Sequence, residues 1–129
     1  MLIVEDQDYM RQMLREFLQG AFPGKNILEA GDGRSALALC SERRPRVVLM
    51  DIGLPDANGI DLTEKIKAML PETAVIIVSS HAGSAYTERA RAAGAFAYVT
   101  KEAVHEELLP AVVAALRQQG SGNTAQENT

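Results

Sequence analysis

The stretch VVLMDIGLP, residues 47–55, decides the fold that we predict for this chain. Its first four residues are apolar and two of them are β-branched, which is typical of a strand buried on both faces in the middle of a parallel sheet. Asp51 follows where this strand leaves the core, and Gly53 and Pro55 mark the loop behind it. In open α/β sheets, ligands bind at the carboxyl ends of the strands. Asp51 is therefore a candidate functional residue, although most loop aspartates only open a turn or cap a helix.

Four further apolar runs have the length of strands, and they lie at 1–4, 27–30, 74–78 and 96–99. Apolar residues at helical spacing follow each run, and the last two helices are predicted over 84–93 and 104–118. Five strands alternating with five helices predict right-handed crossovers and a parallel sheet covered on both faces. Pro110 interrupts the last helix, so we expect a kink there or a separate turn over 104–109 before a later helix start.

Length and composition exclude several classes of protein. The 129 residues suffice for one domain with its own core, and 47% hydrophobic with 23% charged residues is ordinary for a globular protein. The net charge of −4 argues against nucleic-acid binding, and a single cysteine, Cys40, excludes a disulfide or a cysteine-based metal site. No apolar run suits a membrane span or a signal peptide, so we expect a cytoplasmic protein without a membrane partner. Residues 119–129 are polar and predict a flexible tail or the start of a linker after a domain of residues 1–118.

Reactive side chains collect at the carboxyl ends of the predicted strands: Glu5, Asp6, Asp51, Ser79 and Lys101. Clustered carboxylates repel one another unless a cation intervenes, and ligation by oxygen alone suits Mg²⁺, which shares its shell with phosphate groups. A lysine and a hydroxyl can hold phosphoryl oxygens, and a free carboxylate can become an aspartyl phosphate. A buried Lys–Asp ion pair beside an unrelated acidic patch explains any one of these residues better, but it does not explain all five together.

Taken in order, these motifs resemble the receiver domain of two-component response regulators, which has the CheY-like fold, over residues 1–118. The resemblance rests on the pair Glu5-Asp6, on Asp51 in MDIGLPDANG, on Ser79 in VIIVSS and on Lys101 in GAFAYVTK. It implies a doubly wound, flavodoxin-like α/β sheet of strand order 2-1-3-4-5. It also implies that a sensor histidine kinase is the partner that phosphorylates Asp51.

The resemblance further implies a role for each site residue. The Mg²⁺ ligands would be Asp6, Asp51 and the backbone carbonyl of Gly53, with Glu5 acting through water. Ser79 and Lys101 would bind the phosphoryl group.

Three more residues of the site are implied by their place in the family's pattern. Tyr98 would be an aromatic switch that turns inward on activation. Gly53 and His81 lie two residues beyond Asp51 and Ser79, where they would tune the lifetime of the phosphoryl group. An exposed loop histidine without a role is an equally good interpretation of His81.

Two residues depart from the family's pattern. Glu102 follows Lys101 where receivers usually carry a cis proline, and Ser80 stands where alanine is common. Neither change removes a reactive group. Glu102 and the motifs DIGLP and GAFAYVTK most resemble the sequences of regulators with a LuxR-type helix-turn-helix output domain. Such a domain is absent from these residues, so contact with DNA would require a part of the protein not present here.

The leading interpretation is a phosphorylation-dependent signalling switch, with self-catalysed phosphorylation and dephosphorylation rather than enzymatic turnover of other substrates. The alternative is a pseudo-receiver that binds partners without phosphate, although the full set of reactive residues argues against it. A phosphatase with an Asp-x-Asp motif would need an acid in place of Gly53, and a flavodoxin-like protein would need a phosphate loop in place of the acidic residues 5–8. A P-loop is excluded because its Gly-Lys-Ser/Thr triplet is missing.

The last predicted helix carries a broad apolar arc. Its flank of Leu109, Val113 and Leu116 exceeds what a helix packed on a sheet needs, which predicts a homodimer through this helix. The alternative is that the arcs of the first and last helices cover each other.

Overall fold

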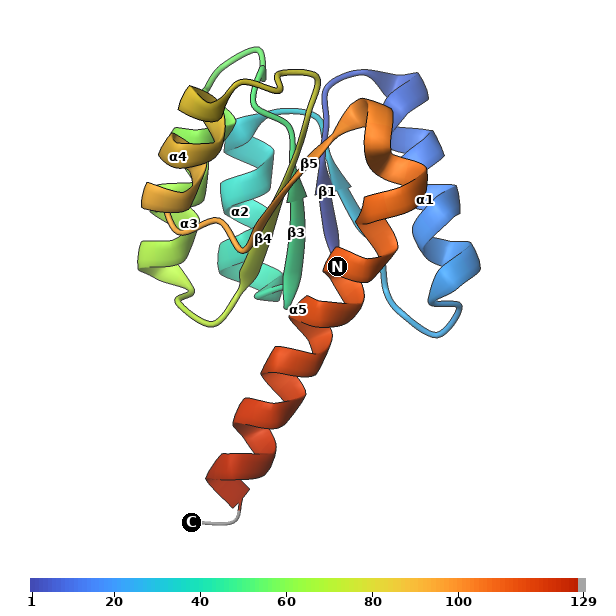
Figure 1. The fold of residues 1–129 in the computed structure, drawn as a ribbon, viewed down its shortest axis with the longest axis vertical. Helices are drawn as coiled ribbons and strands as arrows, with labels where there is room; N and C mark the ends of the chain where they lie inside the picture. Colours follow the sequence, from blue (N-terminus) through green and yellow to red (C-terminus); the bar gives the residue numbers. More distant parts are fainter. Residues whose placement is uncertain (128–129) are drawn as a thin grey trace.

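The computed structural model describes the backbone of residues 1–127 and the side chains of residues 1–119. A single parallel sheet has the strand order β2-β1-β3-β4-β5, with helices on both of its faces (Figure 1). The strands are β1 (Leu2–Val4), β2 (Leu28–Ala30), β3 (Val47–Met50), β4 (Ala74–Ser79) and β5 (Ala97–Thr100). The predicted alternation of strands and helices and the strand order are both confirmed.

The helices are α1 (Asp8–Ala21), α2 (Gly33–Arg43), α3 (Gly59–Met69), α4 (Ser84–Ala92) and α5 (Val104–Glu127), and a 3-10 turn, η1 (Lys101–Ala103), precedes α5. Helices α1 and α5 cover one face of the sheet, and α2, α3 and α4 cover the other (Figure 1). Gly94 follows α4 with a φ of 100°, a left-handed conformation that favours glycine at the end of a helix.

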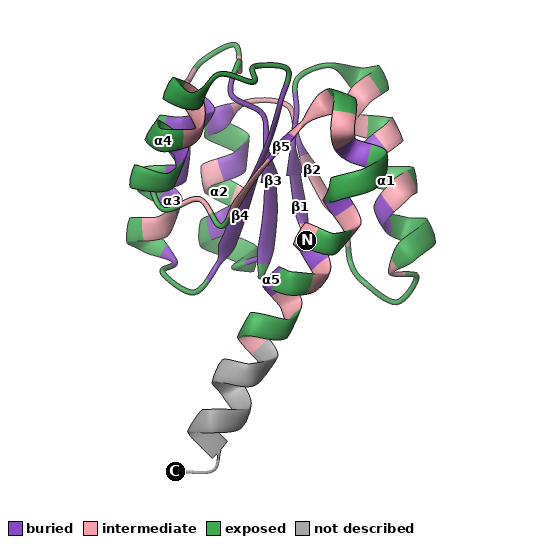
Figure 2. Cartoon of the chain, viewed as in Figure 1, coloured by how far each residue is buried: buried purple, intermediate pink, exposed green. Residues whose placement is uncertain are grey.

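Strand β3 lies in the centre of the sheet, and all four of its residues are buried (Figure 2). Alternate side chains point to opposite faces, so Val48 and Met50 join the core under α2, α3 and α4, while Val47 and Leu49 join the core under α1 and α5. Burial of each such side chain stabilises the fold by about 1.5–3 kcal/mol. Every residue of the run must therefore be apolar, because each of the two faces of the strand packs against a core.

The register of the sheet places the functional strand ends side by side. Val4 pairs with Met50, and Met50 pairs with Ile77, so the residues that follow β1, β3 and β4 leave the sheet at one edge. The Asp51 N–H donates to the carbonyl of Val4 at 3.0 Å, which fixes Asp51 beside Glu5.

Helix α5 begins at Val104, as predicted, and contains Pro110, so the alternative of a separate turn over 104–109 is wrong. It also continues to Glu127, past the expected end at Gln118. Gln119 lies in this extension, and its side-chain amide donates to the carbonyls of Arg46 and Glu72 at 2.7 and 3.0 Å. The domain boundary at residue 118 stays a prediction, and residues 128–129 of the expected tail lie outside the described residues.

Across residues 1–127, no helix combines the length and the apolar character that crossing a bilayer requires.

Candidate functional site

An acidic cluster occupies the carboxyl edge of the sheet, at the ends of β1 and β3. Glu5 and Asp51 are buried, with 1% and 9% of their surface exposed, whereas Asp6 is exposed. One carboxylate oxygen from each of the three residues lies within 4.8 Å of the other two. Carboxylates at this separation repel one another, so the cluster favours a cation between them.

Lys101, the first residue after β5, reaches into this cluster. Its Nζ lies 2.9 Å from Glu5 Oε1 and 3.6 Å from Asp51 Oδ2. Burial by itself lowers the pKa of Lys101, but the hydrogen bond to Glu5 and the charge of Asp51 outweigh burial and raise it. Burial raises the pKa of Glu5, against the opposing effect of Lys101. One ammonium group therefore faces three carboxylates, and the cluster keeps a net negative charge.

The carboxylate oxygens of Glu5 and Asp51 differ in how well they are satisfied. Glu5 Oε2 accepts the Gln7 N–H at 3.1 Å, and Asp51 Oδ1 accepts the Ile52 N–H at 2.8 Å. Glu5 Oε1 is buried and is paired with the Lys101 ammonium at 2.9 Å, whereas Asp51 Oδ2 lies at a longer 3.6 Å from the same ammonium. The Asp51 carboxylate is therefore the less satisfied of the two.

Ser79 and Tyr98 meet at the loop that follows β4. Ser79 is buried, and its Oγ accepts the His81 N–H at 3.1 Å. The Tyr98 hydroxyl donates to the His81 carbonyl at 2.6 Å, so the side chain is attached to the loop and its hydroxyl is not merely in water. Burial is the main cause that raises the pKa of the Tyr98 phenol, which keeps the group a donor.

His81 itself is an exposed residue whose ring lies against Tyr86 of α4. The two rings are stacked, with centroids 4.5 Å apart and planes inclined by 14°. Tyr86 has no predicted role at the site. No sequence signal links a loop residue to the first turn of the next helix in this way, because the contact depends on the path of the loop.

The loop after Asp51 is closed at its base. The Gly59 N–H donates to the Ile52 carbonyl at 2.7 Å, and Gly53 pairs with Asn58 across the loop. A side chain at Gly59 would place a Cβ only 1.9 Å from the Asp51 carbonyl oxygen, so this close approach requires glycine. Gly53 is exposed on this loop, next to the acidic cluster.

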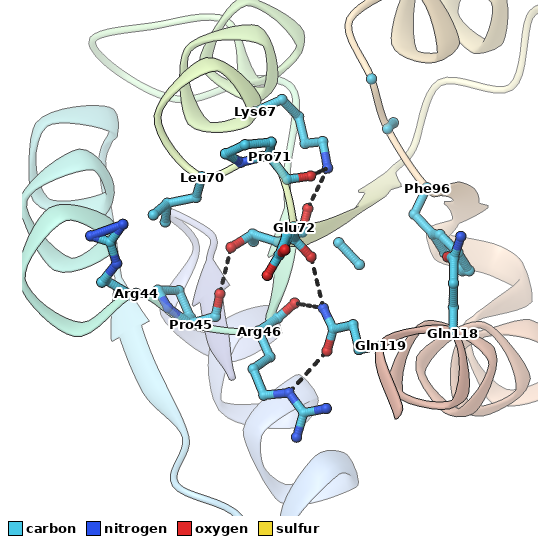
Figure 3. A pocket seen from close by; sticks show the side chains of 14 residues that line it. Arg44, Pro45, Arg46, Lys67, Leu70, Pro71, Glu72, Phe96, Gln118 and Gln119 are labelled. Atoms are coloured by element: carbon cyan, nitrogen blue, oxygen red, sulfur yellow. Dashed lines mark hydrogen bonds between the residues drawn. The ribbon is translucent and has the colours of Figure 1, made fainter. Parts of the chain in front are cut away.

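A separate hollow of about 810 Å³ lies at the opposite, amino-terminal edge of the sheet (Figure 3). Two of its cationic groups, those of Lys67 and Arg46, are bonded to other groups of the protein. Lys67 Nζ donates to the carbonyls of Pro71 and Thr73 at 2.6 and 2.7 Å, and Arg46 Nε donates to Gln119 Oε1 at 3.0 Å. The acidic cluster of Glu5, Asp6 and Asp51 lies at the other end of the strands and shares no residue with this hollow.

The sequence of this chain is similar to that of a known protein family. Residues 1–113 match the response regulator receiver domain family. The chain belongs to this family. The receiver domain is 32% identical over 115 residues to the uncharacterized transcriptional regulatory protein YxjL of Bacillus subtilis, covering 89% of this chain and 53% of that protein. It is 36% identical over 114 residues to the transcriptional regulatory protein PdtaR of Mycobacterium tuberculosis, covering 86% and 53%. The chain thus spans about half the length of these curated relatives.

Solved structures show the same fold. A LuxR-family response regulator from Aurantimonas superposes with a TM-score of 0.80 at 32% identity, covering 91% of this chain and 84% of that one. A CheY-like receiver domain from Methanospirillum hungatei superposes with a TM-score of 0.85 at 28% identity, covering 94% and 95%. The resemblance to receiver domains of transcriptional response regulators is therefore confirmed.

The acidic cluster of this receiver domain fits Mg²⁺. Its donors are all carboxylate oxygens, and one oxygen from each of the three residues lies within 4.8 Å of the other two. Mg²⁺ prefers such hard oxygen ligands and keeps part of its shell for water or phosphate.

The apolar flank of α5 is narrower than the sequence predicted. The sequence predicted that Leu116 is surplus apolar surface, but Leu116 packs against the core under α1 and α5. Leu109 and Val113 are half-buried. The large apolar residues found exposed in the described part of the chain are Tyr9, Met69 and Phe96, and none of them lies on α5. Packing of α1 against α5 consumes part of both arcs.

Proposed function

We propose that this receiver domain is a phosphorylation-controlled switch whose phosphoacceptor is Asp51. The main observation in support is that Asp51 is buried at the carboxyl end of β3. It lies 3.6 Å from the Lys101 ammonium and within a cluster of carboxylates. An Asp51 oxygen attacks the phosphorus of a phosphohistidine on a sensor histidine kinase. The new P–O bond forms as the P–N bond breaks, and the imidazole leaves with a proton from solvent.

We assign Mg²⁺ to Asp6, Asp51 and the carbonyl of Gly53, with Glu5 acting through water. The 2.9 Å contact between Glu5 and Lys101 supports the indirect role of Glu5, because Lys101 already neutralises part of its charge. When bound, the ion offsets the repulsion between the carboxylates and the incoming phosphoryl oxygens.

Lys101 and Ser79 hold the phosphoryl oxygens in this proposal. Lys101 supplies a positive charge, and Ser79 can donate its hydroxyl proton while its oxygen still accepts the His81 N–H. A shift of Ser79 toward the phosphoryl group therefore pulls on the loop to which Tyr98 is bonded. Helix α4 follows this loop and buries only Ala90, so it is weakly held and suited to move.

The names of two relatives support the output that we propose for the switch. The names of YxjL and PdtaR describe transcriptional regulatory proteins, and this chain covers about half of each. We infer a cytoplasmic regulator whose DNA contacts are made by a separate output domain, because the 129-residue chain carries a net charge of −4. The competing proposal is a pseudo-receiver that binds its partners without phosphate.

One measurement separates the two proposals. The protein is incubated with acetyl phosphate and Mg²⁺, and its intact mass is recorded. The gain of one phosphoryl group, lost when EDTA replaces Mg²⁺, supports the switch. An unchanged mass under conditions that modify a known receiver would favour the pseudo-receiver.

Replacement of His81 by alanine is expected to shorten the lifetime of the phosphoryl group. The stacked imidazole lies on the loop behind Ser79, and the proposed role is that it obstructs the water that attacks the phosphoryl group. We expect loss of phosphate to accelerate by roughly threefold, which corresponds to about 0.7 kcal/mol in the barrier. Dephosphorylation is timed by intact mass after removal of the donor, with Tyr86→Leu as a companion that removes the stacking partner. A rate equal to that of the parent protein would exclude this role for His81.

Homodimerisation through α5 remains a proposal, and it now rests on Leu109 and Val113. We expect the beryllofluoride-treated protein to sediment as a dimer and its Val113→Glu variant to sediment as a monomer, because a charge in an apolar contact is costly. Ala114→Glu is the matched control, since Ala114 is exposed on the same helix. A parent protein that stays monomeric at the highest concentration reached ends the proposal.

A further inference from the structure

The loop between β3 and α3, residues 51–58, is attached to helix α2 by the side chain of Asp56. Asp56 Oδ1 accepts the Gly33 N–H at 2.7 Å, and Oδ2 accepts the Arg34 N–H at 3.0 Å. Both donors belong to the first turn of α2, far from Asp56 in the sequence. The carboxylate therefore binds two adjacent backbone groups of another element at once.

These two bonds complete the amino terminus of α2. The first N–H groups of a helix have no partner inside the helix. The side chain of Asp32, the residue before the helix, accepts the Ser35 N–H at 2.7 Å. Asp56 accepts the two N–H groups that Asp32 leaves open, and a carboxylate at this end of a helix is also favoured by the helix dipole. The hydrogen bond from Gly33 is the largest cause that lowers the pKa of Asp56, so the group is ionised at neutral pH.

Gly33 allows this attachment because it has no side chain. A Cβ at Gly33 would lie 2.9 Å from Leu62 Cδ1, 3.0 Å from Ala57 Cβ and 3.2 Å from Asp56 Oδ1. The loop therefore rests directly on the backbone of α2, and any larger residue at position 33 would push it away.

The other end of the same loop holds the carboxylate of Asp51. Asp51 Oδ1 accepts the Ile52 N–H at 2.8 Å, and the Ile52 carbonyl accepts N–H groups from Gly59 at 2.7 Å and Leu54 at 3.2 Å. The base of the loop is thus tied together at Ile52, while Asp56 ties down its tip. A displacement of the tip reaches Asp51 through only a few residues.

We propose that Asp56 is a positioning residue for the phosphoacceptor site, holding the loop so that the Asp51 carboxylate and the Gly53 carbonyl face one cation. The inference rests on the proposed function, in which these groups hold Mg²⁺. Asp56 itself does not touch the ion, and its effect passes through the backbone of the loop. The structure thereby makes the amino end of α2 part of the support of the site.

Three variants test this role: Asp56→Ala, Asp56→Asn and Gly33→Ala. Mg²⁺ affinity is measured by titration calorimetry on the unphosphorylated protein, and amide hydrogen exchange of residues 33–35 is followed by NMR. We expect Asp56→Ala to weaken Mg²⁺ binding by about 3–10-fold. Loss of a residue that supports a metal ligand usually weakens binding by about 10–100-fold, and we expect less here because Asp56 is exposed. Exchange should rise at Gly33 and Arg34 but not at Ser35, which Asp32 still caps.

The other two variants separate position from charge. Asp56→Asn removes the same charge as alanine but keeps one acceptor, so an intermediate affinity supports positioning, whereas equal losses would indicate a simple charge effect and overturn it. Gly33→Ala keeps every charge and should weaken Mg²⁺ binding by displacing the loop. Unchanged affinity in Asp56→Ala would also overturn the inference. A parent protein that binds Mg²⁺ but takes no phosphoryl group would instead remove the proposed function and leave this inference standing.

Discussion

The Asp51→Asn variant is expected to take up no phosphoryl group from acetyl phosphate in the presence of Mg²⁺. An amide is a far weaker nucleophile than a carboxylate, and it also removes one negative oxygen donor from the cluster of Glu5, Asp6 and Asp51. The expected loss is complete, because the other two acids of the cluster are assigned to the metal. Intact mass after incubation with acetyl phosphate measures the result.

The matched control for this variant is Asp61→Asn, which changes an exposed aspartate in the first turn of α3. It should be phosphorylated like the parent protein. If Asp51→Asn gains the same mass as the parent, the phosphoacceptor is another residue and the assignment of Asp51 is wrong.

Replacement of Lys101 by methionine is expected to lower the free energy of unfolding by about 2 kcal/mol. Removing one partner of a buried ion pair typically costs about 3–5 kcal/mol, because the other charge is left buried without its counter-ion. The cost is smaller here since the Lys101 side chain is 20% exposed and Glu5 can take up a proton. Urea unfolding in the presence of EDTA measures the loss, and Lys65→Met, on the exposed surface of α3, is the control.

The pH dependence of this loss follows from the direction of the pKa shifts. The pKa of Glu5 in the folded protein lies above its ordinary value of 4.5, so stability falls as the pH rises through the window just above 4.5, where only the folded state keeps the proton. Removal of Lys101 raises the pKa of Glu5 further, so Glu5 stays protonated in the folded protein up to a higher pH. The stability that Lys101→Met loses should therefore be smaller at pH 5 than at pH 8. The contribution of Lys101 is present below 10.5 and is lost as the pH rises through its raised pKa.

A second substitution isolates the pair. Glu5→Gln removes the buried charge, so the double variant Glu5→Gln/Lys101→Met should recover most of the stability that Lys101→Met loses. A deficit that is independent of pH, or one that Glu5→Gln does not relieve, would show that Lys101 acts through its packing and not through its charge.

The sequence by itself determined the sheet and the identity of the reactive residues. Runs such as 47–50 are too apolar to be stable anywhere except between two layers of helices, and alternation with helices makes the strands parallel. Parallel strands end at one edge, so Glu5, Asp51 and Lys101 had to meet once the strand order was known. Strand periodicity and chain order are local properties, and they can be read from one sequence.

Only the tertiary structure decided which partner each group takes. Lys101 lies closer to Glu5 than to Asp51, Tyr98 bonds to the backbone of His81, and Asp56 caps a helix from a distant loop. Gln119 of α5 likewise donates its side-chain amide to the carbonyls of Arg46 and Glu72, which precede β3 and β4. Each of these contacts joins segments whose separation depends on loop path and register. Hydrogen bonds are satisfied within a few tenths of an ångström, and sequence spacing does not specify position at that scale.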